Sequence, residues 1–234
     1  MTDTNEFGQA IGRPVRDWQG AAAPTRRPLE GRYCKLLPLH AAEHGPALYA
    51  AYQAGDGSLW TYLPVGPFAS EQAYLQWLTG AQESQDPLFF TILAGPARSP
   101  AGVASYLRMQ PAMGVIEVGH ITYAPSLQRT RAATEVMYLM MARAFDSWGY
   151  RRYEWKCDSL NAPSRAAAQR LGFTYEGTFR HNVVYKGRNR DTAWYAITDD
   201  EWPSIKQGFE RWLAPDNFDG EGQQRRSLAQ CRDA

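Results

Sequence analysis

The sequence predicts a mixed α+β domain with a central, mostly antiparallel twisted sheet flanked by helices. Segments with an apolar residue at every second position alternate with segments in which apolar residues recur every three or four positions. Their order is β-α-α-β-β-β-α-β-α-β-β-α, and most neighbouring strands can pair as hairpins. One strand–helix–strand unit in the middle of the chain requires a parallel pair, with the helix packed across both strands.

Composition excludes several classes of protein. The 234 residues carry 25 Lys and Arg against 24 Asp and Glu, so a net charge of +1 favours neither nucleic acid nor a membrane surface. Three cysteines lie far apart without a CxxC pair or a Cys/His cluster, so neither a metal site nor a disulfide framework is expected. No secretory leader and no run of about 18 apolar residues is found, and a cytoplasmic protein is expected.

Three regions are expected. Residues 1–29 show no clear period and are interpreted as an extension that wraps or dangles, residues 30–213 as the folded domain, and residues 214–234 as a polar tail. In the domain's first half, the patterns predict these elements in order: a strand over 32–39, a helix over 40–53, an aromatic-rich loop over 55–68, a helix over 71–82 capped by Ser70, and a hairpin over 87–95 and 102–111.

The second half begins with a strand over 115–125, then a helix over about 132–148 closed by Gly149. Residues 151–160 alternate strictly, with Tyr153, Trp155 and Cys157 on one face and charged residues on the other. The remaining elements are a helix over 162–172, strands over 174–186 and 192–198, and a helix over 199–213.

The short segment "LQRTRAAT", residues 127–134, joins the strand over 115–125 to its crossover helix. The first N–H groups of a helix have no partner inside the helix, and with the helix dipole they form an anion site. Small residues at 132 and 133 would let a diphosphate approach the backbone, and Arg129 and Arg131 suit phosphate oxygens. An ordinary turn with surface arginines is the alternative.

Two motifs in this order resemble those of the GNAT N-acetyltransferases, and most of all the branch of ribosomal-protein N-terminal acetyltransferases. The first is the acetyl-CoA pyrophosphate loop, here "QRTRAA" over Gln128, Arg129, Thr130, Arg131, Ala132 and Ala133. The second is Asn-x-x-Ser before a helix that ends in Gly-Phe, here "NAPSRAAAQRLGF" over 161–173. The resemblance covers roughly residues 30–200 and implies a GNAT fold in which the two parallel strands splay apart.

Two positions depart from the pattern. Arg131 replaces the middle glycine of the first motif, at the cost of that glycine's flexibility, and we expect it to contact a phosphate directly. Ala168 stands where many members carry the tyrosine that reprotonates the leaving thiolate. The resemblance therefore leaves the general acid of this chain open.

The resemblance also implies the binding residues for acetyl-CoA, without a metal. Backbone groups of Ile121, Thr122 and Tyr123 would pair with the pantetheine arm, and a strand N–H there would polarise the thioester carbonyl. Asn161 and Ser164 would hold the arm from the other side, with Ser164 also at the reaction centre. Capping of the short helix is the alternative role for both.

Glu117 is the candidate base for the amine. At pH 7 an α-amino group is roughly a tenth neutral and a lysine-type amine less than about a thousandth, so the second kind of acceptor needs a base more. Unbroken alternation puts Glu117 on one face and His120 on the other, unless a bulge intervenes, and a structural role is preferred for His120. Cys157 in an apolar strand is expected to be inert, which favours direct transfer over an acetyl-enzyme.

Aromatic residues suggest where the acceptor binds. Trp60 and Tyr62 in the loop over 55–68, together with Trp155 and Tyr185, are expected to contact it, although such aromatics could equally be core. The cations of "RHNVVYKGRNR", residues 180–190, could line a pocket for the acceptor or form a solvated turn, which is the commoner role of such runs. The expected partner is a small-molecule amine or a protein N-terminus, with no nucleic acid or membrane, and a homodimer stays open. The alternative functions are a non-catalytic acyl-CoA-binding or regulatory module and an interaction protein without cofactor.

Overall fold

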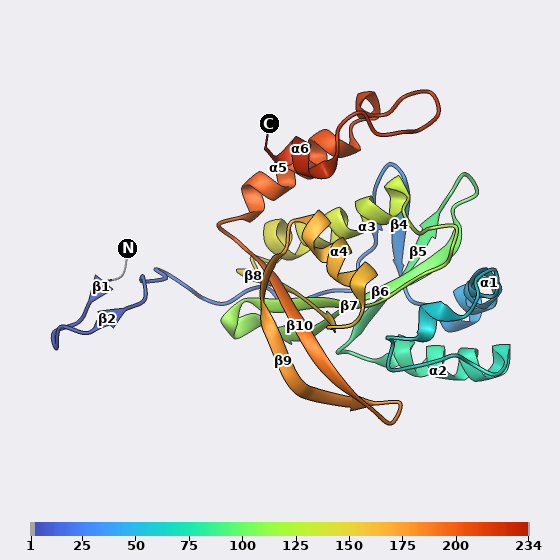
Figure 1. The fold of residues 1–234 in the computed structure, drawn as a ribbon, viewed down its shortest axis with the longest axis horizontal. Helices are drawn as coiled ribbons and strands as arrows, with labels where there is room; N and C mark the ends of the chain where they lie inside the picture. Colours follow the sequence, from blue (N-terminus) through green and yellow to red (C-terminus); the bar gives the residue numbers. More distant parts are fainter. Residues whose placement is uncertain (1–2, 234) are drawn as a thin grey trace.

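A computed structural model describes residues 3–233, and Figure 1 shows one twisted sheet with helices on both faces. The eight strands lie in the order β3-β4-β5-β6-β7-β8-β10-β9, and all pairs are antiparallel except β7 with β8. The strands are β3 (Leu29–Glu30), β4 (Cys34–Pro38), β5 (Leu88–Ala94), β6 (Ser99–Gln110), β7 (Val115–Tyr123), β8 (Arg152–Asp158), β9 (Thr174–Tyr185) and β10 (Arg188–Thr198).

The helices follow the predicted order, and the predicted fold class is confirmed. They are α1 (Ala41–Gln53), α2 (Glu71–Glu83), α3 (Arg131–Ala142), α4 (Ala162–Leu171), α5 (Trp202–Leu213) and α6 (Leu228–Arg232). Ser70 caps α2 as predicted, because its side chain accepts from the Ala73 N–H. A π-type turn over Arg143–Ser147 extends α3, and Gly149 follows with φ +71°, the left-handed conformation expected there.

Two apolar cores lie on opposite faces of the sheet. Residues that alternate along β5 separate them: Phe90 and Ile92 pack into the core with α3, α4 and α5, whereas Phe89 packs into the core with α1 and α2. Because side chains of a strand point alternately to the two faces, a single strand contributes to both cores. The sheet is thus a central layer between two groups of helices.

The parallel pair separates along its length. β7 and β8 are in register from Val115 opposite Arg152 to Val118 opposite Trp155, and there the pairing stops. Beyond that point β7 continues to Tyr123 paired only with β6, and β8 continues to Asp158 paired only with β10. The predicted splay between the crossover strands is therefore present, and among residues 3–233 the edge of β7 that faces β8 has no strand partner from Gly119 onward.

A β-bulge lies in β7 at the point of separation. Thr122 is opposite Val103 and Gly119 is opposite Ser105, so two residues of β7, His120 and Ile121, face one residue of β6. His120 has φ +48°, which is uncommon for a non-glycine residue. The bulge interrupts the alternation, so the exception allowed for in the sequence applies and His120 does not lie on the face opposite Glu117.

Both terminal segments have structure. The N-terminal segment forms a small hairpin, β1 (Asp3–Thr4) with β2 (Ala10–Ile11), and reaches the domain at Trp18, whose indole N–H donates to the Ala112 carbonyl at 2.8 Å. After α5 the chain forms a short 3-10 turn over Pro215–Asn217 and then α6, with Phe218, Leu228 and Cys231 buried. The segment predicted as a polar tail thus packs onto the domain through its few apolar residues.

Candidate functional site

The N-terminus of α3 leaves backbone donors free. Thr130 caps the helix, and its Oγ1 accepts from the Ala133 N–H at 3.1 Å while the Thr134 N–H donates to the Thr130 carbonyl. The N–H groups of Arg131 and Ala132 have no acceptor within the described residues 3–233. Free donors at the positive end of a helix dipole can bind an anion such as a diphosphate.

Two of the predicted phosphate ligands use their side chains elsewhere. The Arg131 guanidinium lies over the Phe218 ring, 4.1 Å from its centroid, and 5.4 Å from that of Tyr33. Gln128 donates from Nε2 to the Tyr123 carbonyl at 2.9 Å. Arg131 thus holds the C-terminal segment by cation–π contacts, and Gln128 ties the loop to the end of β7. Arg129 is exposed with φ +59°, so its side chain is the free cation of this loop among the described residues.

The open edge of β7 begins at Gly119, two residues before the predicted pantetheine-binding stretch over 121–123. Ile121, Thr122 and Tyr123 all lie beyond the last β7–β8 pair. The Thr122 carbonyl accepts from the Tyr52 hydroxyl at 3.2 Å, which fixes this stretch to α1. The Tyr123 hydroxyl is buried without a partner among the described residues. The stretch is held in place on its α1 and β6 sides, and its β8 side is available to an extended ligand.

Across the split, the start of α4 carries the second motif. Asn161 caps the helix, since its Oδ1 accepts from the Ser164 N–H at 3.1 Å. The Ser164 hydroxyl accepts from the Trp155 indole N–H at 3.0 Å. The capping role that the sequence left open is therefore present. Trp155 is buried against Phe173 on the face of the sheet that α3, α4 and α5 cover, which is opposite to the face that carries Glu117.

The surroundings of Ala168 show why a tyrosine does not fit at this position. It is fully buried in α4, and its carbonyl accepts from the Phe173 N–H just after the helix. A phenol at this position would have to displace core side chains, which costs energy in a closely packed interior. At position 168, where many family members carry the general acid, α4 therefore packs into the core.

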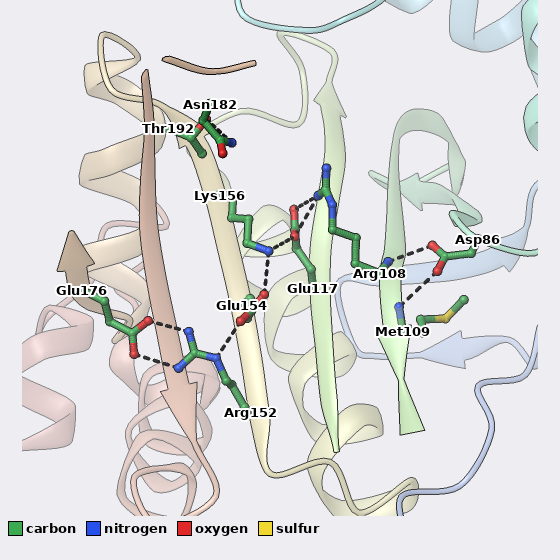
Figure 2. A network of polar contacts seen from close by, with 10 residues as sticks. All are labelled: Asp86, Arg108, Met109, Glu117, Arg152, Glu154, Lys156, Glu176, Asn182 and Thr192. Atoms are coloured by element: carbon green, nitrogen blue, oxygen red, sulfur yellow. Dashed lines mark hydrogen bonds and ion pairs between the residues drawn. The ribbon is translucent and has the colours of Figure 1, made fainter. Parts of the chain in front are cut away.

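Glu117 is the centre of a charged network, drawn in Figure 2, that crosses one face of the sheet. Its carboxylate accepts from Arg108 Nη1 at 2.8 and 2.9 Å and lies 2.9 Å from Lys156 Nζ. Lys156 also lies 2.7 Å from Glu154, which accepts from Arg152 at 2.6 Å, and Arg152 binds Glu176 beyond it. The network alternates in sign across β6, β7, β8 and β9.

Burial distinguishes this network from an ordinary surface array. Glu117 is 3% exposed, and the Lys156 side chain is 9% exposed and lies 3.7 Å from the centroid of the Trp194 ring. Arg108 and Lys156 together contact both oxygens of the Glu117 carboxylate, which ties this side chain into the network. Sequence alternation placed Arg152, Glu154 and Lys156 on one face, but it did not reveal that the face is covered or that Arg108 completes it.

His120 lies close to the same face. Its ring centroid is 5.0 Å from that of Phe89, and its Nδ1 is 3.0 Å from the Ser105 hydroxyl. Ser105 Oγ donates its single proton to the Gly119 carbonyl at 3.1 Å, so it accepts from His120 Nδ1–H. That arrangement leaves Nε2 with a free lone pair. Burial, together with the nearby Arg108 charge, lowers the pKa of His120 to about 4, so the ring is neutral near pH 7.

The predicted acceptor aromatics have different positions. Trp60 is buried edge-on to Tyr52 and Phe68 in the core of α1 and α2. The Tyr62 hydroxyl donates to the Leu160 carbonyl at 3.2 Å. The Tyr185 hydroxyl donates to Asp158 at 2.8 Å, and burial and this carboxylate raise the pKa of Tyr185 to about 12. Tyr62 and Tyr185 therefore meet the segment between β8 and α4 from two sides, whereas Trp60 serves the core.

One more contact joins these two sides. Lys186, in the turn between β9 and β10, donates to the Trp60 carbonyl at 2.6 Å. The loop between α1 and α2 therefore bonds directly to the β9–β10 turn and, through Tyr62, to the residue two positions after β8. The contacts connect the two loops beside the C-terminal end of β8.

Other classes of site find little support. Burial raises the pKa of the Cys157 thiol, which disfavours the thiolate needed for an acetyl-enzyme. Within residues 3–233 no group of three or more His, Cys, Asp or Glu is placed to hold a metal ion. None of the helices described is both long and apolar enough to cross a membrane.

Comparison with known proteins agrees with this geometry. The family model described as the acetyltransferase (GNAT) domain matches residues 35–174. A GCN5-related N-acetyltransferase from Brucella melitensis is 46% identical with a TM-score of 0.92, over 94% of this chain and 100% of that one. A probable GNAT-family acetyltransferase from Chromobacterium violaceum is 41% identical with a TM-score of 0.76, over 82% and 96% of the two chains. A search of curated proteins finds no match.

More distant structures share the fold alone. A protein described as a ribosomal-protein-serine acetyltransferase from Vibrio cholerae is 16% identical with a TM-score of 0.64, over 74% and 97% of the chains. The microcin C7 self-immunity acetyltransferase MccE, solved in complex with acetyl-CoA and AMP, is 19% identical with the same TM-score, over 72% and 93%. Splayed parallel strands, an open helix N-terminus and these matches agree, and the chain belongs to the GNAT acetyltransferase family.

Proposed function

We propose that this protein is an acetyl-CoA-dependent N-acetyltransferase that transfers the acetyl group directly to a primary amine. The observation that carries the proposal is the juxtaposition of an unpaired β7 edge with two free N–H groups at the α3 N-terminus. The helix end suits the diphosphate and the strand edge suits the amide-containing pantetheine arm. The acetyl-CoA complex of the fold neighbour MccE supports the same co-substrate.

We assign the proton acceptor to His120 in place of Glu117. In the reaction the amine nitrogen bonds to the thioester carbonyl carbon, the C–S bond breaks with its electron pair on sulfur, and the nitrogen loses a proton. His120 is neutral near pH 7 with Nε2 unprotonated, and Ser105 holds its tautomer. Glu117 instead fixes Lys156 and Arg108 beside the bulge.

We further propose that the acceptor is a small-molecule amine. A protein N-terminus would need an open groove, whereas here Lys186, Tyr62 and Tyr185 link the loops on either side of the β8 C-terminus. A short amine can reach the strand split within such a linked ring of loops. A protein N-terminus is the second candidate, and the turnover assay below separates the two.

Binding is tested first, by calorimetry with acetyl-CoA on Ala133→Asp and on the matched control Ala73→Asp. Each alanine is the third residue of its helix, and each N–H donates to the capping side chain. A carboxylate at the third residue stabilises either helix through the helix dipole, but only at α3 would it also repel the phosphates of acetyl-CoA. We expect Ala133→Asp to weaken acetyl-CoA binding at least about tenfold and Ala73→Asp to leave it unchanged. Equal effects, or no binding by the wild-type protein, would refute the phosphate site.

Turnover is tested by release of CoA thiol with a panel of small amines and short peptides. We expect release with a small amine and a fall in kcat of about a hundredfold or more in His120→Asn, with unchanged acetyl-CoA affinity. Glu117→Gln should retain more activity than His120→Asn, and the reverse order would restore Glu117 as the base. Binding without thiol release for any amine would favour the non-catalytic acyl-CoA-binding module.

A further inference from the structure

The N-terminal arm, defined here as residues 3–17, makes few contacts with the rest of its own chain. Figure 1 shows its hairpin standing clear of the domain. The hydrogen bonds of the hairpin are internal: Asn5 accepts from Phe7 and Gln9 N–H groups, and the short strands pair with each other. Among the described residues, the single polar contact from the arm to the domain is the ion pair of Arg13 with Asp200.

The arm exposes apolar side chains at regular intervals. Phe7 is 78% exposed, and Ile11 and Val15 follow at four-residue spacing, also exposed. Single exposed apolar residues are ordinary, but an isolated two-stranded hairpin is at best marginally stable in water. The base of the arm is nevertheless fixed, because Trp18 bonds to Ala112 and packs on Gly114. A fixed base with an apolar tip suits contact with another surface.

A complementary surface lies on β9. This strand forms one edge of the sheet, so one row of its backbone N–H and C=O groups has no strand partner in the described chain. Its exposed apolar side chains are Tyr175, Phe179 and Val184. Gly177 and His181 have positive φ, the register of β9 with β10 shifts close to both residues, and the pairing is regular from Val183 to Tyr185. A short free edge matches the length of the two-residue strands of the arm.

Charge is complementary as well. Residues 3–11 carry Asp3 and Glu6 and no Lys or Arg. The segment over 180–190 carries Arg180, Lys186, Arg188 and Arg190 and no Asp or Glu. Opposite charges across an interface favour encounter and fix its register. The arm reaches far enough to use them, since the 11 residues from Phe7 to Trp18 can span at most roughly 36 Å.

We infer that the arm of one copy binds the β9 edge of a second copy, so that two reciprocal contacts form a twofold dimer. Phe7 and Ile11 cover the apolar side chains near Val184, and the acidic arm tip lies against the cations of the β9–β10 turn. This assigns a role to the cations Arg180, Arg188 and Arg190, which the proposed acetyl transfer does not use. Neither surface includes His120 or the start of α3, so the test of the dimer does not depend on the proposed base or on the phosphate site.

The test is the mass in solution, measured by size exclusion with light scattering on the full chain. We expect twice the 26.3 kDa of one chain for the wild-type protein. Two variants should give the single-chain mass. The arm variant carries both Phe7→Asp and Ile11→Asp, and the edge variant carries Val184→Asp. The control Met113→Asp, which alters an exposed apolar residue outside both surfaces, should stay dimeric. Circular dichroism and acetyl-CoA binding check that each variant is folded.

A mixture of the two variants tests which surfaces meet. The arm variant still has an intact β9 and the edge variant an intact arm, so the mixture should associate more strongly than either variant alone. Raised salt should weaken the wild-type dimer, since charge pairs at the rim are screened. A monomeric wild-type protein would overturn the inference, and so would an edge variant that remains dimeric.

Discussion

Lys156 offers a sharp test of the charged network, through the variant Lys156→Met. The methionine keeps a long flexible side chain but removes the ammonium that lies 2.9 Å from Glu117 and 2.7 Å from Glu154. Those two carboxylates are directly opposite each other in the β7–β8 register and are 3% and 6% exposed. Without Lys156 they would be like charges facing each other in a buried site.

The size of the effect follows from burial. Leaving a buried charge without its partner costs about 3–5 kcal/mol, although Arg108 and Arg152 still pair with one carboxylate each and favour the lower end. For a chain of this length each kcal/mol shifts Tm by about 2–4 °C, so we expect Tm to fall by about 6–12 °C. Part of this decrease in stability comes from loss of the cation–π contact between the Lys156 ammonium and the Trp194 ring.

Lys206→Met is the matched control. Lys206 also forms a short ion pair, 2.8 Å from Asp146, but both side chains are more than a third exposed. Exposed pairs contribute about 0–1 kcal/mol, so this variant should lose at most a few degrees. Urea unfolding gives the two free-energy changes, with equal m values required for the comparison. Equal losses for both lysines would refute the reasoning that burial makes the Lys156 network sensitive.

Three further predictions concern other buried groups. Glu135→Gln should lower the free energy of unfolding, measured in urea, by about 3 kcal/mol. The buried Glu135 carboxylate accepts from the N–H groups of Arg32, Tyr33 and Cys34, and an amide cannot replace all three bonds. An unchanged urea midpoint would contradict this. Burial lowers the pKa of His120 to about 4, so as pH falls from 6.5 the unfolded chain takes up a proton before the folded chain does. The free energy of unfolding of the wild-type protein should therefore fall by up to about 3 kcal/mol between pH 6.5 and 4. The decrease should be smaller for His120→Gln over the same range. Burial raises the pKa of Cys34 and Cys157, so both thiols should react slowly with iodoacetamide near neutral pH until the chain unfolds. The variant Cys157→Ala should retain turnover. Rapid labelling of the folded protein would argue for an accessible thiolate.

Local patterns were enough to predict the order of the elements and much of their extent. Alternation in "RRYEWKCDSL" identified β8, and Ser70, Gly149 and Gly172 marked helix ends where the structure has them. The reason is that period, caps and left-handed glycines depend on the nearest few residues. The pyrophosphate loop and the start of α4 belong to the same class of signal.

The surroundings of three predicted site residues depend on residues distant in the chain. Arg131 seemed a phosphate ligand from its neighbours, but Phe218, which lies 87 positions further along the sequence, takes its guanidinium. The face of His120 could be given only on the condition that no bulge intervenes, because a bulge is defined by the register with β6, which no local period records. Glu117 was proposed as a base from strand alternation, which does not record that Arg108 and Lys156 reach its carboxylate from neighbouring strands.

By itself, then, the sequence determined the α+β order, the crossover unit and the two motifs that indicate the family. Only the tertiary structure decided which charges are buried together, which side of β7 is open, and which aromatic residues belong to the core. Propensity, period and capping are properties of contiguous residues, whereas burial and charge pairing arise when strands from β6 to β10 come side by side. The chemistry of Glu117 and His120 depends on that second kind of information.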